Sequence, residues 1–109
     1  MKLIIKRDQD KAFLGGMNLF LECRVELTAE ESELIKKYKA HRQPLTYRER
    51  KGVEIPGLRI EDLVRGVTYK TKDLDVLLNN EEVIKEACAS FKNYLLLMKS
   101  FGGEEVIEF

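Results

Sequence analysis

The segment Lys36 to Gly52, with the sequence KKYKAHRQPLTYRERKG, concentrates side chains that could hold a negatively charged ligand. It has seven Lys or Arg residues and one acid, Glu49, and so a net charge of +6, whereas the 109-residue chain has nineteen basic and nineteen acidic residues. Tyr38 and Tyr47 add rings on which nucleic-acid bases could stack, a combination that single-strand binders use. The candidate polyanion-binding residues are Lys36, Lys37, Lys39, Arg42, Arg48, Arg50 and Lys51.

Other properties of the chain favour an ordinary explanation for this basic segment. The chain is neutral with a pI of about 6.6, whereas dedicated nucleic-acid domains are usually strongly basic, and it has no RNP, KH or zinc-finger pattern. Residues 73–109 contain eight acids and three bases, a net charge of −5, which could balance the segment within one fold or between chains. We therefore favour a solvated loop and helix end, with nucleic acid or another polyanion as the alternative and an acidic protein partner as the third.

Two carboxylates at helical spacing, Glu82 and Glu86, could bind a cation or act in acid–base chemistry, with Asn93 on the same face. The charged outer face of a helix has the same pattern, and Glu81 with Lys85 forms an ordinary i, i+4 pair beside them. A small enzyme using carboxylate chemistry is therefore the second alternative, and a solvated helix face is the preferred interpretation.

The other reactive residues form no recognisable catalytic or metal-binding set. His41 is the only histidine, lies within the basic segment and has no Cys or His at metal-ligand spacing. Cys23 and Cys88 fall at core-facing positions, which predicts two buried, reduced thiols. The chain lacks the glycine motifs that bind phosphate and has no G-x-S-x-G nucleophile. We therefore predict no catalytic site, no metal site, no cofactor and no enzymatic activity.

Hydrophobic periodicity predicts the strands that would position these residues. Leu3 and Ile5 indicate a short first strand, and the connection DQDKAFLGG ends in a glycine pair typical of a turn. Residues 17–27 alternate strictly between apolar and polar side chains, which predicts a long strand with one buried face. Further short strands are predicted just before Pro56 and over 67–72. The last residues, EEVIEF, predict a final strand in the domain's own sheet, with capture by a partner's sheet as the alternative.

Capping signals and a helical period predict the helices. Thr28 and Glu31 fit a capping box that begins a helix, and Asp73 begins a short helix that runs to residue 78. The main helix covers 81–101 and ends at a glycine pair. At about 100° per residue, its apolar side chains cover an arc of about 140° around Phe91, as expected for a helix lying on a sheet.

These elements predict a single α+β domain over residues 1–109. We expect an antiparallel sheet of four to five strands, with two main helices, 28–40 and 81–101, packed on one face. The prediction requires that the apolar faces of 17–27 and 83–101 meet in one interior.

Three apolar residues fall outside the predicted core: Phe20 on the polar face of the long strand, and Leu96 and Leu97 beyond the arc of the main helix. This surplus predicts self-association of a small non-enzymatic binding or assembly module, with a homodimer favoured over a larger homo-oligomer or another protein partner. The longest apolar run, Tyr94 to Met98, is far too short to span a bilayer, and the first ten residues lack the apolar core of a signal peptide. We therefore expect a cytoplasmic protein without a membrane partner.

Overall fold

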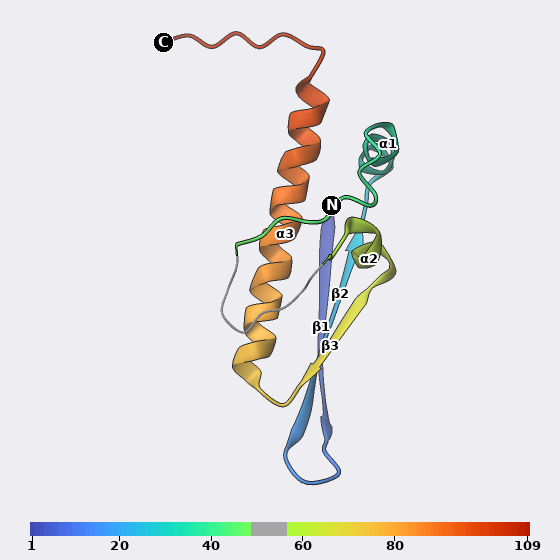
Figure 1. Ribbon diagram of the computed structural model, residues 1–109, viewed down its shortest axis with the longest axis vertical. Coiled ribbons are helices and arrows are strands. Elements are labelled where there is room, and N and C mark those ends of the chain that lie inside the picture. Colours follow the sequence, from blue (N-terminus) through green and yellow to red (C-terminus); the bar gives the residue numbers. More distant parts are fainter. Residues whose placement is uncertain (49–56) are drawn as a thin grey trace.

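Two long strands pair along their whole length. β1 (Lys2–Lys11) and β2 (Met17–Glu26) are antiparallel, from Lys2 opposite Glu26 to Lys11 opposite Met17. In the computed structural model, which describes residues 1–48 and 57–109, the shorter β3 (Val67–Thr71) pairs with the other side of β2. The resulting sheet has the order β1-β2-β3 and, with three helices of which one is long, makes an α+β fold (Figure 1).

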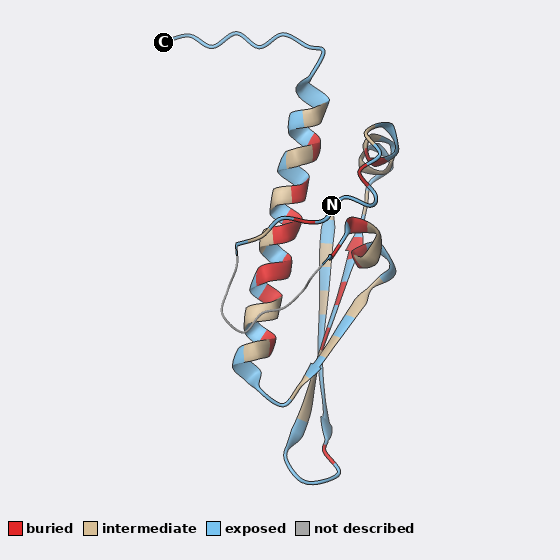
Figure 2. Ribbon diagram, in the orientation of Figure 1, coloured by how far each residue is buried: buried red, intermediate tan, exposed pale blue. Residues whose placement is uncertain are grey.

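The alternation of residues 17–27 places one face of β2 in the core, as predicted. Leu21, Cys23 and Val25 are buried, whereas the polar residues between them are exposed. The predicted first strand was too short, because β1 continues to Lys11 through residues with no apolar alternation. Beyond the reach of β3 the β1–β2 hairpin is solvated on both faces (Figure 2), so pairing with β2 is enough to keep this part extended.

The longest element is α3 (Leu74–Ser100), a helix of 27 residues that runs alongside the sheet (Figure 1). Asp73 caps it by accepting hydrogen bonds from the N–H groups of Asp75 and Val76, and Gly102 follows it with a φ of 91°, so both predicted ends are confirmed. The predicted break between residues 78 and 81 is wrong. The helix continues through Asn79 and Asn80 because the turns on both sides of them bury side chains on the same face.

The core forms where α3 meets the sheet, as the apolar patterns of 17–27 and 83–101 predicted. One cluster contains the buried residues of β2 together with Ile84, Phe91 and Leu95 of α3. α2 (Ile60–Arg65) contacts the same strand and contributes Ile60 and Leu63, and Gly66 with a φ of 98° ends it.

α1 (Ala29–Lys37) does not lie on the sheet face as predicted. It stands beyond the end of β2 and contacts α3 (Figure 1), where Ile35 reaches the core and Lys99 pairs with Glu30. Its predicted start is confirmed, because the Thr28 hydroxyl accepts the N–H of Glu31 at 3.1 Å and the Glu31 carboxylate accepts the N–H of Thr28 at 2.9 Å.

The prediction of four to five strands is wrong for the part of the chain that the structure describes, which forms three. The strand expected just before Pro56 lies outside the described residues. Residues 104–109, expected as the last strand, are exposed and unpaired with any described strand. The reason is geometric: α3 continues past the start of β1, so the residues after it lead away from the sheet (Figure 1).

Candidate functional site

The basic segment does not form one surface. Lys36, Lys37, Lys39 and Arg42 are exposed at the end of α1. Arg48 lies instead beside the middle of α3, where its Nε donates to Oε1 of Glu86 at 2.9 Å and its backbone N–H donates to the same oxygen at 3.2 Å. Arg50 and Lys51 are outside the described residues. The seven predicted cations are therefore divided, and one of them pairs with the acidic part of the chain within the fold.

The two carboxylates considered for chemistry are both engaged in ion pairs. Glu82 accepts a hydrogen bond from Lys85 Nζ at 3.3 Å, and Glu86 accepts from Arg48. Asn93 is exposed on the same helix. This arrangement is the solvated, salt-bridged helix face that the spacing also predicted.

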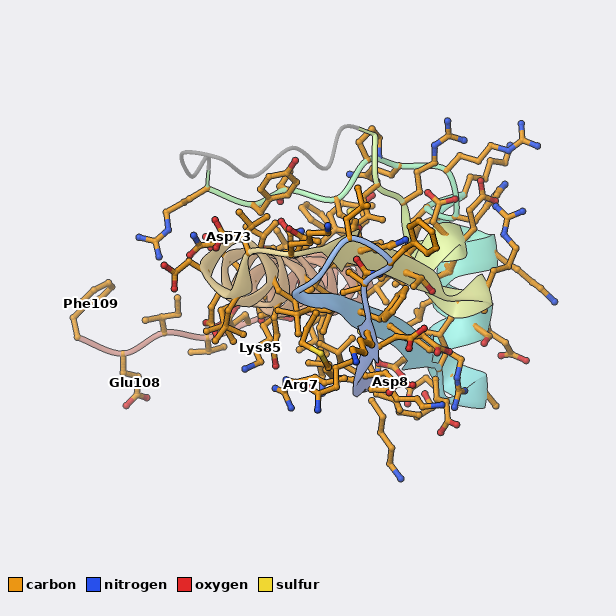
Figure 3. All side chains as sticks on the ribbon, turned by 90° about the horizontal axis from the view of Figure 1, so that it is seen from below. Arg7, Asp8, Asp73, Lys85, Glu108 and Phe109 are labelled. Atoms are coloured by element: carbon orange, nitrogen blue, oxygen red, sulfur yellow. The ribbon has the colours of Figure 1, made fainter. Side chains whose placement is uncertain are left out.

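Glu81 is the buried charge that sequence reasoning missed. Its side chain is only 3% exposed, although it was expected on the solvated helix face. Arg7 reaches it from β1 with two nitrogens, Nε donating to Oε2 at 3.2 Å and Nη2 donating to Oε1, and Lys85 Nζ lies 3.7 Å from Oε1 (Figure 3). The helical period held part of the signal, because at about 100° per residue Glu81 lies about 80° from Phe91, just beyond the edge of the apolar arc. The contact links β1 to α3.

The cysteines are buried thiols. Burial raises the pKa of Cys23 to about 11, with Glu81 nearby acting in the same direction, and burial raises the pKa of Cys88 to about 11. Both groups stay protonated at neutral pH, and a protonated thiol is a poor nucleophile and a poor metal ligand. His41 is exposed, and within the described ranges no group of three His, Cys, Asp or Glu residues could hold a metal ion.

The three apolar residues predicted to mediate self-association lie on two separate surfaces. Leu96 and Leu97 are more than half exposed on α3. Phe20 is half-buried on the other face of the sheet, in a hollow of about 340 Å³, and the Lys70 ammonium lies 5.8 Å from its ring centre. The hollow is lined by Lys6, Asp8, Gln9, Asp10, Phe20, Glu22 and Thr68. The structure therefore does not bring Phe20 together with the two leucines.

Further apolar side chains are exposed at the hairpin tip and beyond Leu96 and Leu97, where the sequence did not predict exposed apolar surface. At the tip of the β1–β2 hairpin, Phe13 is fully exposed and Leu14 is 89% exposed. At the other end of the chain, exposed apolar side chains continue from α3 into the C-terminal segment, which we define as residues 104–109. They are Leu96, Leu97, Phe101, Val106, Ile107 and Phe109.

The free edge of β1 is a third open surface. Among the described residues, β1 pairs only with β2, and none of its ten residues is fully buried (Figure 2). Leu3 and Ile5 pack against the core but are only partly buried, and Ile4 is exposed on the opposite face. An unpaired strand edge with apolar side chains on it is a surface on which another strand can add.

Comparisons of the chain with protein-family models, with curated proteins and with solved structures found no match. Within residues 1–48 and 57–109, no helix combines the length and the apolar character needed to cross a membrane.

Proposed function

We propose that this chain is a binding and assembly module, rather than an enzyme, and that it associates with further copies of itself. One observation carries the proposal: large apolar side chains are exposed in succession from Leu96 through Phe101 to Phe109. Isolated exposed apolar residues are ordinary, but groups of them on a small protein mark surfaces that bind another molecule.

The energetics of burial support this choice. A fully buried large apolar side chain contributes roughly 1.5–3 kcal/mol, so two or three of these residues outweigh much of the entropy lost on association. Three carboxylates of α3, those of Glu81, Glu82 and Glu86, are already paired with basic side chains within the fold. Burial of the exposed apolar side chains is therefore the main source of free energy available for association.

Light scattering after size-exclusion chromatography, over a concentration series, tests the proposal. We expect the mass to rise above the monomer value of 12.7 kDa as concentration increases. The paired change Ile107→Ser with Phe109→Ser should weaken this association. The matched control, Phe13→Ser with Leu14→Ser at the hairpin tip, removes as much exposed apolar surface elsewhere and should not. A mass of 12.7 kDa at every concentration would contradict the proposal.

A second candidate is polyanion binding at the end of α1. Lys36, Lys37, Lys39 and Arg42 are exposed there and form no ion pair with another described residue. Fluorescence anisotropy with a labelled single-stranded oligonucleotide tests it, with an expected log–log salt slope of about −0.7 for each phosphate neutralised. Absence of binding at low salt removes this candidate, and Lys36→Glu with Arg42→Glu should abolish any binding that occurs.

A further inference from the structure

We propose that the C-terminal segment of one copy adds as a strand to the free edge of β1 in a second copy. The inference names the interface of the proposed self-association and rests on it. Four features of the two surfaces support it: backbone groups, apolar faces, charges and the direction in which the segment leaves α3.

The backbone of β1 is open over its first half only. The N–H groups of Gln9 and Lys11 donate to the side chains of Asp8 and Asp10, at 2.8 Å each, and therefore point to the free edge. Alternate residues of an antiparallel strand direct their N–H groups to the same edge, and the register with β2 is unbroken, so those of Leu3 and Ile5 point there too. The edge N–H groups of Gln9 and Lys11 therefore already have hydrogen-bond partners within the chain. Those of residues 2–6 remain available to an added strand.

The apolar faces match across the proposed interface. Leu3 and Ile5 are only half-buried because no described strand lies beside β1 to cover them. In an extended chain, Ile107 and Phe109 share one face of the C-terminal segment. Laid antiparallel beside β1, Ile107 would cover the exposed part of Leu3, and Phe109 would lie opposite Met1, which also packs partly buried against the core.

The charges match on the opposite face. Lys2, Ile4 and Lys6 are exposed on the outer face of β1, with the pattern basic, apolar, basic. Glu104, Val106 and Glu108 share the other face of the segment, with the pattern acidic, apolar, acidic.

An antiparallel alignment brings the two patterns into register. It places Glu104 opposite Lys6, Val106 opposite Ile4 and Glu108 opposite Lys2. Opposite charges and apolar pairs directly across two strands are stabilising. On the core side Ile107 then falls opposite Leu3, and Glu105, at the start of the segment, falls opposite Ile5.

The occupant is a second copy because the segment is directed away from its own sheet. α3 continues past the start of β1 (Figure 1), and Glu108 and Phe109 extend away from the rest of the molecule (Figure 3). Gly102, with a φ of 91°, separates the segment from the helix and allows it to leave at an angle. Docking within one chain would require the segment to turn back along α3.

Charge reversal with rescue tests the interface by sedimentation velocity over a concentration series. Glu104→Lys with Glu108→Lys changes the segment, and Lys2→Glu with Lys6→Glu changes the edge. We expect each variant alone to self-associate about tenfold more weakly or worse, and an equimolar mixture of the two to recover association. Lys72→Glu with Lys92→Glu, two exposed lysines away from both surfaces, is the matched control and should associate like the unmodified chain.

A peptide competition on the unmodified chain keeps the test independent of variant folding. A peptide of residues 102–109 should dissociate the assembled form, and the same peptide with Glu104→Lys and Glu108→Lys should not. Undiminished association of both charge variants, or no effect of the peptide, overturns the interface while leaving the proposed function intact. A chain that is monomeric at every concentration overturns both, including the case in which the segment docks on its own β1.

Discussion

β1 and β2 are strands of equal length in one sheet, and their surroundings differ on every side. β2 has a strand on each edge and α3 over one face, and it buries Leu21, Cys23 and Val25. β1 has one neighbouring strand among the described residues, and its equivalent residues Leu3 and Ile5 are only partly buried. Position in the sheet, rather than alternation of side chains, therefore decides how much each strand contributes to stability and which strand can bind a partner.

The largest expected effect is a difference in the free energy of unfolding between two Leu→Ala substitutions, one on each strand. Leu21→Ala should lower the free energy of unfolding by about 3–4 kcal/mol, because it opens a cavity in a fully buried site. Leu3→Ala on β1 should cost about 1 kcal/mol, because water already reaches that side chain. Urea denaturation of both variants measures the difference, and equal losses would show that the two strands are not distinct.

A second expected effect concerns pH and the thiol on β2. Burial raises the pKa of Cys23 from 9.0 to about 11, so below pH 9 the folded and unfolded chains both hold the proton. Between pH 9 and 11 the unfolded chain releases it and the folded chain does not, which favours unfolding. Stability should therefore fall over this window, by about 2 kcal/mol for this thiol at pH 11.

Cys88, whose pKa is also raised to about 11, should add a similar loss. Denaturation midpoints from pH 8 to 11 measure the sum. In Cys23→Val the stability should decline less steeply with pH. An unchanged slope would show that the Cys23 thiol does not cause the decline.

A somewhat smaller effect is expected at the charged contact of Arg7 on β1 with Glu81 on α3. Arg7→Met leaves the buried Glu81 carboxylate without its two-nitrogen partner and should cost about 2 kcal/mol, reduced from the value for fully buried pairs because the Arg7 side chain is itself partly solvated. Lys85→Met removes a more distant cation, 3.7 Å from Glu81, and should cost less than about 1 kcal/mol. Thermal unfolding compares the two variants. A larger loss of stability for Lys85→Met would show that Lys85, and not Arg7, is the main partner of Glu81.

The smallest expected effect is on the solvated face of α3. Leu96→Lys should change the free energy of unfolding by less than about 0.5 kcal/mol, because this side chain is more than half exposed. Its neighbour Leu95 is buried, and Leu95→Ala should cost about 3 kcal/mol. Circular dichroism during urea titration measures both, and a large loss for Leu96→Lys would place that residue in the core.

Local patterns predicted part of the fold well. The alternation of residues 17–27, the capping box at Thr28 and the cap at Asp73 were all confirmed, because each depends on residues close together in the chain. Two failures had a common cause. The continuity of α3 through Asn79 and the burial of Glu81 both depend on what the helix lies against, and only contact with β1 and β2 supplies that information.

The candidate interface was predicted only in outline. The β-forming pattern of 104–109 is visible in the sequence, and it suggested a strand in the domain's own sheet or in a partner's. The structure leaves these residues exposed beside no described strand. The exposure of Leu3 and Ile5 could not be predicted, because a strand's place at the edge of a sheet depends on contacts between segments far apart in the chain.

The sequence by itself therefore determined the buried face of residues 17–27, the capping box at Thr28 and the cap at Asp73, since these follow from neighbouring residues. The tertiary structure alone decided that β2 is enclosed, that β1 keeps a free edge, and that the basic segment is divided between α1 and Glu86. Those outcomes depend on long-range packing, in which each apolar face can be covered only by the elements that the chain can bring beside it.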